Sequence, residues 1–193
     1  MRILERMLLT HDINEIEVVC ESNTVYCTCT NEVGEISCVN ESFIKVSGYS
    51  EKELIGQNHN IMRHPDMPQV IYHLMWESLK SRKTFLGLIK NKTKDGSFYW
   101  LMNEISIMPK RKSDPLTYYA YKELPSKRAI FHISSLYKEL LECEAKNGIK
   151  ASAKYLDEYL SFRGVNYKEY LETFRDASGL FKVGYFMARK LFK

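Results

Sequence analysis

The sequence lacks the features that mark several large classes of protein. It has no uninterrupted apolar run near the roughly 18 residues that a membrane-spanning helix requires. Glu5 and Arg6 break the first apolar stretch, so we do not expect residues 1–9 to be a signal peptide. The net charge of +4 over 193 residues is too small to indicate nucleic-acid binding. We therefore expect a cytoplasmic protein that binds no nucleic acid.

Cys-x-x-Cys pairs are also absent, and the five cysteines are an odd number. We interpret all five as free thiols in a reducing compartment. Cys27 and Cys29 would face the same way on a strand, but no matching Cys/His pair nearby could complete a metal site. No nucleophile–base pair stands out either. We therefore expect neither a metal site nor an enzyme.

The first third of the chain predicts a β-hairpin followed by short helices. Residues 24–30 are rich in strand-forming side chains, and 35–39 form the return strand after a turn. Asn40 stands where a helix N-cap would be, and Gly48 ends that helix. A capping-box pattern then predicts a second short helix that ends near Gly56.

The rest of the chain predicts a longer helix, three more strands and a helical tail. Apolar residues recur at helical spacing over 68–80. Strands are predicted at about 84–91, 97–108 and 116–123, and the period is helical from Pro125 onward. We therefore expect an α+β fold, in which a five-stranded antiparallel sheet carries short helices on one face and an all-α C-terminal module follows.

Three segments carry a resemblance to a known family. They are Asn40–Tyr49, His59–Pro68 and Lys90–Trp100, the last with Asp95-Gly96 at its turn. Together they resemble the PAS domain of bacterial aerotaxis and energy-taxis receptors. The Arg-His-Pro-Asp-Met-Pro string within the second segment is far more specific than the general PAS pattern. The resemblance implies the PAS fold and non-covalent binding of FAD, whose redox state the domain reports to the chemotaxis machinery.

Carried over position by position, the resemblance also implies which residues contact the cofactor. Phe85 stands where the family usually has a tryptophan, and its smaller ring can still pack against the isoalloxazine. The Asn91 amide can match the donor and acceptor groups of the isoalloxazine edge, and the Arg63 guanidinium suits pyrophosphate or reduced flavin. The full set of predicted cofactor residues is Asn40, Arg63, His64, Asp66, Tyr72, Phe85, Asn91 and Trp100.

Other interpretations of the same residues stay open. Residues 63–66 could form only a surface ion pair around a turn, Asn40 could be a helix cap, and Trp100 could be a core aromatic residue. His73, within an apolar helix, could be an axial haem ligand. The alternatives to a flavin sensor are therefore a haem-PAS gas sensor and a cofactor-free PAS interaction module. Light sensing of the LOV type is disfavoured, because His59 stands where that family places its reactive cysteine.

We divide the chain into an N-terminal amphipathic segment (1–19), a PAS sensor domain (20–124) and a helical signalling or docking module (125–193). Residues 126–193 fit no kinase, cyclase or methyl-accepting segment, so we expect the signal to pass to a separate membrane-bound chemotaxis transducer. Formation of a homodimer is an open alternative. The segment Leu180–Lys193 has a basic and an apolar stripe. It would pack on neighbouring helices, or dock on the transducer or the inner face of the cytoplasmic membrane.

Overall fold

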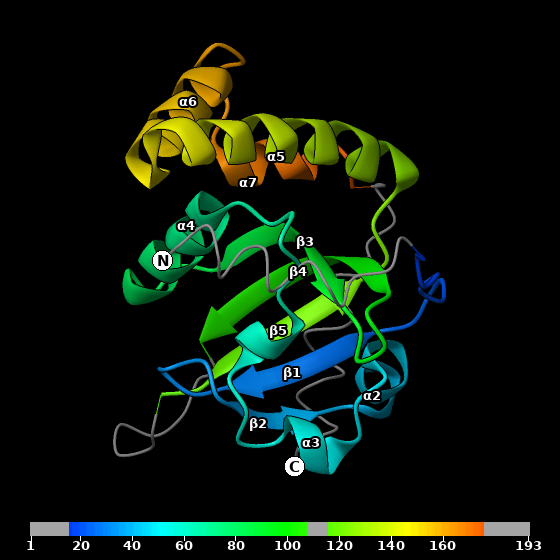
Figure 1. Ribbon diagram of the computed structural model, residues 1–193. Helices are drawn as coiled ribbons and strands as arrows, with labels where there is room; N and C mark the ends of the chain where they lie inside the picture. The colour runs from blue at the N-terminus through cyan, green and yellow to red at the C-terminus, as the bar shows by residue number, and fades with distance from the viewer. Residues whose placement is uncertain (1–15, 108–115, 176–193) are drawn as a thin grey trace.

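The five predicted strands form one antiparallel sheet with the strand order β2-β1-β5-β4-β3. The computed structural model describes residues 16–107 and 116–175, and Figure 1 shows their arrangement. The predicted α+β fold is confirmed. Its elements are β1 (Tyr26–Thr30), β2 (Ile36–Val39), α2 (Glu41–Ser47), α3 (Glu51–Leu54), η1 (His59–Met62), α4 (Gln69–Lys80), β3 (Phe85–Lys92), β4 (Phe98–Ile107), β5 (Tyr118–Glu123), α5 (Lys127–Asn147), α6 (Ile149–Ser161) and α7 (Tyr167–Glu172).

Local signals set the ends of α2. The side-chain oxygen of Asn40 accepts hydrogen bonds from the backbone N–H of Phe43 at 3.1 Å and of Cys27 at 3.0 Å. The first bond caps the helix, and the second ties it to β1. Gly48 ends the helix with a φ of 73°, a left-handed conformation that glycine adopts without steric cost. The predicted helix boundaries are therefore confirmed.

Short helices and α4 cover one face of the sheet, which we call the inner face (Figure 1). Fully buried apolar side chains of α2, α3 and η1 pack there against β4. The loop predicted before Pro68 contains the 3-10 helix η1, which the sequence patterns did not reveal. The buried residues of this cluster include Phe43, Leu54, Met62, Tyr99 and Leu101.

The helical tail packs on the other face of β3 and β4 and along the β3 side of the sheet (Figure 1). Leu88 and Trp100 share one buried apolar cluster with Ile133 and Tyr137 of α5. This cluster extends into α4, α6 and α7. The described part of the tail and the sheet therefore bury a common core. The boundary between residues 124 and 125 stays a prediction.

A carboxylate of the tail caps α4. Glu144, near the end of α5, accepts hydrogen bonds from the backbone N–H groups of Gln69 at 3.0 Å and Val70 at 2.9 Å. The Ser152 hydroxyl of α6 donates to the same carboxylate at 3.1 Å. Because the first N–H groups of a helix have no partner within the helix, Glu144 replaces the local cap that Pro68 cannot supply.

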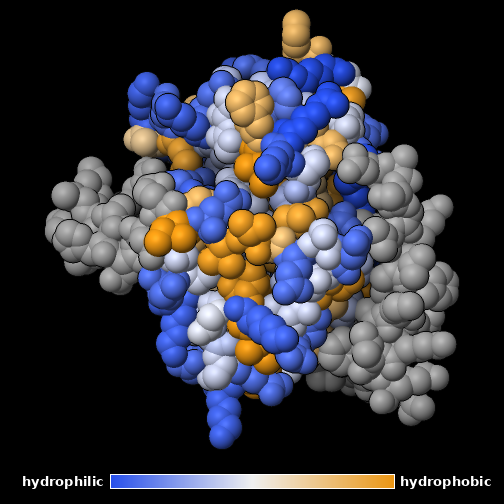
Figure 2. Space-filling view, turned by 90° about the vertical axis from the view of Figure 1, so that its right-hand side faces the viewer, coloured by the Kyte–Doolittle hydropathy of each residue, from blue (hydrophilic) through white to orange (hydrophobic). Residues whose placement is uncertain are grey.

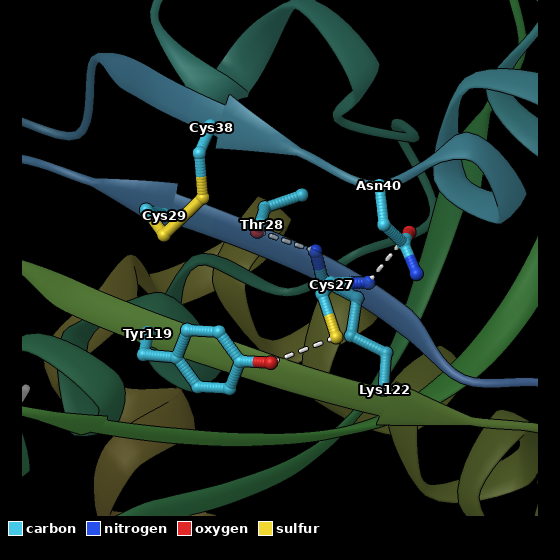
Figure 3. The surroundings of a disulfide bond; sticks show 7 residues. All are labelled: Cys27, Thr28, Cys29, Cys38, Asn40, Tyr119 and Lys122. Carbon is cyan, nitrogen blue, oxygen red and sulfur yellow. Dashed lines mark hydrogen bonds between the residues drawn. A yellow bond between two sulfur atoms is a disulfide. The ribbon is translucent and has the colours of Figure 1, made fainter. Parts of the chain in front are cut away.

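The interpretation of the cysteines is wrong for two of them. Cys29 and Cys38 form a disulfide between β1 and β2, with their Cα atoms 4.8 Å apart (Figure 3). The two residues stand directly opposite each other in the strand register, which brings their side chains together. Cysteine count and spacing do not reveal such a pairing, because it depends on the register. Cys20, Cys27 and Cys143 are free.

Some apolar side chains of the described residues remain exposed. Figure 2 shows apolar residues gathered in the middle of one face, with hydrophilic residues around them. Val19, Phe131 and Phe162 are the most exposed large apolar residues, and they belong to different parts of the chain. Exposure of single apolar residues is ordinary at protein surfaces.

Three predictions fall outside the described residues. They concern the amphipathic segment 1–9, the loop around 109–115 and the C-terminal segment Leu180–Lys193. Within the described ranges, no helix is both long and apolar enough to cross a membrane.

Candidate cofactor site

A cavity of about 290 Å³ lies between the inner face of the sheet and the residues of η1 and α4. Its apolar wall comes from both sides. The sheet contributes Ile89, Ile105, Tyr118 and Ala120, and α4 contributes Tyr72, Met75, Trp76 and Leu79. This concave site with aromatic and aliphatic walls is typical of small-molecule binding.

The polar side chains of the cavity are amides, basic residues and the hydroxyl groups of two threonines and two tyrosines. Among the described residues, the wall includes no carboxylate. A site of this composition favours a ligand that carries negative charge together with hydrogen-bonding groups. The amides are Asn58, Asn60, Asn91 and Asn103, and the bases are His59, Arg63 and Lys122.

Asn91 has a buried donor aimed at no protein group. The residue is 3% exposed, and its Nδ2 has no hydrogen-bond partner in the described part of the chain. An unpaired buried amide costs roughly 1–3 kcal/mol, so a ligand that accepts this hydrogen bond would recover the loss. A backbone bridge between Arg63 and Asn91 joins the loop before α4 to β3 at this point.

Arg63 and Tyr72 form a stacked pair in the cavity wall. The guanidinium carbon of Arg63 lies 4.2 Å from the centroid of the Tyr72 ring. This cation–π contact orients the guanidinium and leaves its N–H donors for other partners. Burial raises the pKa of Tyr72 to about 12, although the charge of Arg63 opposes the shift. Tyr72 therefore stays a neutral phenol at physiological pH.

Lys122 of β5 is another basic residue in the wall. It is 1% exposed, and its Nζ donates a hydrogen bond of 2.6 Å to the Thr28 hydroxyl (Figure 3). Burial lowers the pKa of Lys122 to about 7. Burial, with a smaller contribution from the charge of Lys122, also lowers the pKa of His59 to about 3, so that imidazole is neutral.

The structure brings three of the eight predicted cofactor residues to the cavity, namely Arg63, Tyr72 and Asn91. It does not bring the other five there. Asn40 caps α2, as its alternative interpretation proposed. Phe85 stacks on Tyr167 of α7 with ring centroids 6.2 Å apart. Trp100 packs against Tyr137 of α5 at 6.3 Å, which agrees with its interpretation as a core aromatic residue.

His64 and Asp66 lie outside the cavity wall and organise the loop before α4. His64 is 2% exposed, and its Nδ1 accepts a hydrogen bond of 3.1 Å from the backbone N–H of Asp66. The Asp66 carboxylate forms an ion pair of 2.7 Å with Lys90. Burial, followed by the charge of Lys90, lowers the pKa of His64 to about 4.

Sequence patterns did not single out Lys122 or Asn103. The two residues stand opposite each other in the register of β4 and β5, so both reach the inner face. Tyrosines occur on both faces of β5, so the sequence of this strand shows no contrast of polarity between its faces. The one signal was that Lys122, two residues after Ala120, shares a face with this small apolar residue.

Comparison with known proteins supports the same fold. Residues 36–121 match the family model described as PAS fold. A solved light-oxygen-voltage domain, studied with a flavin analogue, superposes with a TM-score of 0.50. The alignment covers 74% of this chain and 96% of that one at 14% identity, a level that shows the fold alone. The sheet and its helices therefore have the PAS fold.

Two curated proteins show similarity in sequence. The aerotaxis receptor of Escherichia coli strain K12 is 34% identical over 119 residues, which are 61% of this chain and 23% of the receptor. The nitrogen fixation regulatory protein of Klebsiella pneumoniae is 30% identical over 89 residues, which are 46% of this chain and 18% of that protein. This stretch of the chain is thus related to a segment of the aerotaxis receptor. The match spans less than a quarter of the length of either relative.

Proposed function

We propose that this chain is a flavin-based redox sensor of the energy-taxis type. It binds FAD with the isoalloxazine ring in the cavity and passes the redox state to a separate membrane-bound chemotaxis transducer by protein contact. The observation that carries the proposal is the buried, unpaired Asn91 amide beside Arg63, in a wall whose described residues include no carboxylate. The motif resemblance and the related domain of the aerotaxis receptor support the same assignment.

The residues of the cavity fit a flavin. Its isoalloxazine ring is a flat aromatic system with donors and acceptors along one edge, which the Asn91 amide can match. Arg63 would bind the phosphates or the charge of the reduced ring, and Tyr72 holds Arg63 in place. The volume of about 290 Å³ suits a ring system rather than a whole dinucleotide. When bound, FAD supplies reversible electron transfer, and the protein supplies binding and orientation.

The two alternative cofactor chemistries receive less support from the described residues. The His73 side chain is 55% exposed, lies 3.2 Å from Glu77 and is not part of the cavity wall, which disfavours it as a haem ligand. A photochemical thiol adduct needs a cysteine at the cavity. None of the three described free cysteines lines it.

The visible spectrum of the protein purified in air tests the proposal. We expect flavin bands that bleach with dithionite, and FAD in the mass spectrum of the released cofactor. A Soret band would favour a haem sensor instead. A colourless protein that takes up neither FAD nor haem would refute both and leave the cofactor-free interaction module.

Transfer of the signal to a transducer needs a test of its own. We expect the FAD-loaded full chain to bind the cytoplasmic part of a chemotaxis transducer with an affinity that differs between the oxidised and reduced forms. Equal affinity of both forms would contradict signalling by protein contact, even if FAD is bound.

A further inference from the structure

Lys122 is an amine buried in the cavity wall without a carboxylate partner. Its neighbours are the Thr28 hydroxyl at 2.6 Å and the Phe43 ring, whose centroid lies 4.1 Å from Nζ. None of the ion pairs within residues 16–107 and 116–175 involves Lys122. The lysines that do form ion pairs with carboxylates there are Lys45, Lys90, Lys94, Lys154 and Lys168.

Two titratable groups that lie beside Lys122 on the inner face, His59 and Tyr26, are neutral. His59 approaches from η1, and its imidazole is uncharged for the reasons given above. Tyr26 stands directly opposite Lys122 in the register of β1 and β5, and burial raises the pKa of its phenol to about 12. Cys27 points to the other face of β1, where burial raises the pKa of its thiol and the Tyr119 hydroxyl donates to its sulfur at 2.9 Å. Figure 3 shows the amine of Lys122 at the Thr28 hydroxyl, whereas Cys27 is bonded to Tyr119. A charge on Lys122 therefore has no counter-charge among these neighbours.

This environment makes both forms of the amine accessible. An isolated buried ammonium is costly, whereas an anion placed within a few ångströms in a medium of low dielectric constant would stabilise it strongly. With a pKa of about 7 in the free protein, the amine is poised to bind a proton when such an anion appears. Arg63 cannot respond in this way, because a guanidinium stays protonated at all physiological pH values.

We propose that Lys122 is the residue that receives negative charge on the bound flavin ring and takes up one proton from solvent as that charge arrives. The inference rests on the proposed function, because reduction of the flavin delivers the charge. The electrons pass from an external donor to the flavin, and Lys122 neither gives nor accepts them. Its amine gains one proton and becomes an ammonium. The negative charge of the reduced flavin ring then balances the positive charge of this ammonium.

Proton uptake by Lys122 predicts an effect beyond a loss of affinity for the flavin. A lysine that only fills space or donates to Thr28 would alter flavin binding without altering the number of protons taken up on reduction. A proton-accepting lysine adds one proton per reduced flavin in the pH range between its pKa values in the oxidised and reduced protein. The proton count therefore separates the two roles.

The first experiment needs no flavin. NMR titration of protein with ¹³C-labelled lysine side chains gives the pKa of Lys122, with Lys122→Met to assign the signal. We expect a pKa near 7 in the flavin-free protein and an increase of at least one pH unit when reduced FAD is bound. A value near 10.5 without flavin, or no increase with it, would overturn the inference.

The second experiment counts protons. The midpoint potential of bound FAD is measured in dithionite titrations between pH 6 and pH 9. Above pH 7 we expect the number of protons taken up per two electrons to fall by about one in Lys122→Met and in Lys122→Arg, since an arginine carries charge but gains no proton. Lys90→Met is the matched control, because it removes a buried lysine that pairs with Asp66 away from the cavity.

The outcomes separate the two proposals. An unchanged proton count in Lys122→Arg, with FAD bound, would overturn the role of Lys122 and leave the flavin sensor standing. Failure of the wild-type protein to bind FAD would refute the proposed function, and the role of Lys122 with it. If Lys122→Met does not fold, the titration of the wild-type amine and the Lys122→Arg variant still decide the matter.

Discussion

The hydroxyl of Tyr137 in α5 donates a hydrogen bond of 2.7 Å to the backbone carbonyl of Leu88 in β3. β3 is an edge strand of the sheet, and an edge strand has backbone groups without a strand partner. Tyr137 supplies one of these partners and is itself bonded to the Tyr167 hydroxyl of α7. The helical tail is thus joined to the sheet by hydrogen bonds as well as by apolar packing.

Removal of this hydroxyl should weaken the whole molecule. We expect Tyr137→Phe to lower the free energy of unfolding by about 1–2 kcal/mol, because the Leu88 carbonyl loses a buried partner. Tyr155→Phe is the control, since its hydroxyl bonds to Glu139 at the surface, and we expect a loss within about 0.5 kcal/mol. Urea denaturation of both variants measures the difference. Equal losses would show that the Leu88 contact adds nothing.

Arg63 should matter for flavin binding rather than for folding. We expect Arg63→Ala to weaken FAD binding by roughly tenfold or more, because a charge-assisted hydrogen bond is lost from the cavity wall. Arg163→Ala removes a comparable stacked arginine, 3.6 Å from the Tyr159 ring centroid in the tail, and should leave the affinity unchanged. Fluorescence titration with FAD measures both. Similar weakening in the two variants would point to a general loss of stability.

Asn91 should lower the stability of the flavin-free protein and strengthen the binding of FAD. We expect Asn91→Leu to leave the flavin-free protein as stable as the wild type, or more stable by about 1 kcal/mol, because an unpaired buried amide is replaced by an apolar side chain of similar size. The same variant should bind FAD more weakly. Thermal unfolding with and without FAD measures both effects. A clear loss of stability without FAD would mean that the amide has a partner in the free protein.

The buried His64 should make the protein sensitive to mild acid. Its folded-state pKa of about 4 lies below the ordinary value near 6.5, so the unfolded chain binds the proton more readily. The contribution is fully present above pH 6.5 and is lost as the pH falls toward 4, with a slope of about 1.4 kcal/mol per pH unit. We expect His64→Gln to lose stability less steeply in urea denaturation between pH 6.5 and 4.5. Parallel curves would contradict the assignment.

The Cys29–Cys38 disulfide should be measurable in the intact chain. We expect three of the five cysteines to react with a thiol reagent under denaturing, non-reducing conditions, and all five after reduction. The bond closes a short loop, with a sequence separation of 9, so reduction should lower the free energy of unfolding by about 2–3 kcal/mol. Cys38→Ser should not respond to reductant. Five reactive thiols before reduction would rule out the bond.

Much of the fold could be predicted because its signals are local. Asn40 and Gly48 mark the two ends of α2 within a few residues of the helix, and the structure uses both as predicted. The disulfide could not be predicted in the same way. It depends on how β1 and β2 align, and cysteine spacing along the chain carries no information about that alignment.

The site was predictable only in part, for a related reason. Asn91 and Trp100 were both expected at the cofactor, but the hairpin register pairs Asn91 with Tyr99. Successive residues of a strand point to opposite faces, so Trp100 faces the tail while Asn91 lines the cavity. Lys122 was not predicted to line the site. Aromatic residues occupy both faces of its strand, so the strand lacks the alternation of polar and apolar residues on which such a prediction depends.

The cap that Glu144 places on α4 links the wall of the cavity to the helices that follow the sheet. Tyr72 lines the cavity from the first turn of α4, two residues beyond the Val70 N–H that this carboxylate holds. A ligand that draws the start of α4 inward must either break these hydrogen bonds or pull the end of α5 along with it. The carboxylate would then couple the movement of α4 to that of α5. The position of α5 relative to the sheet would therefore depend on whether the cavity holds a ligand.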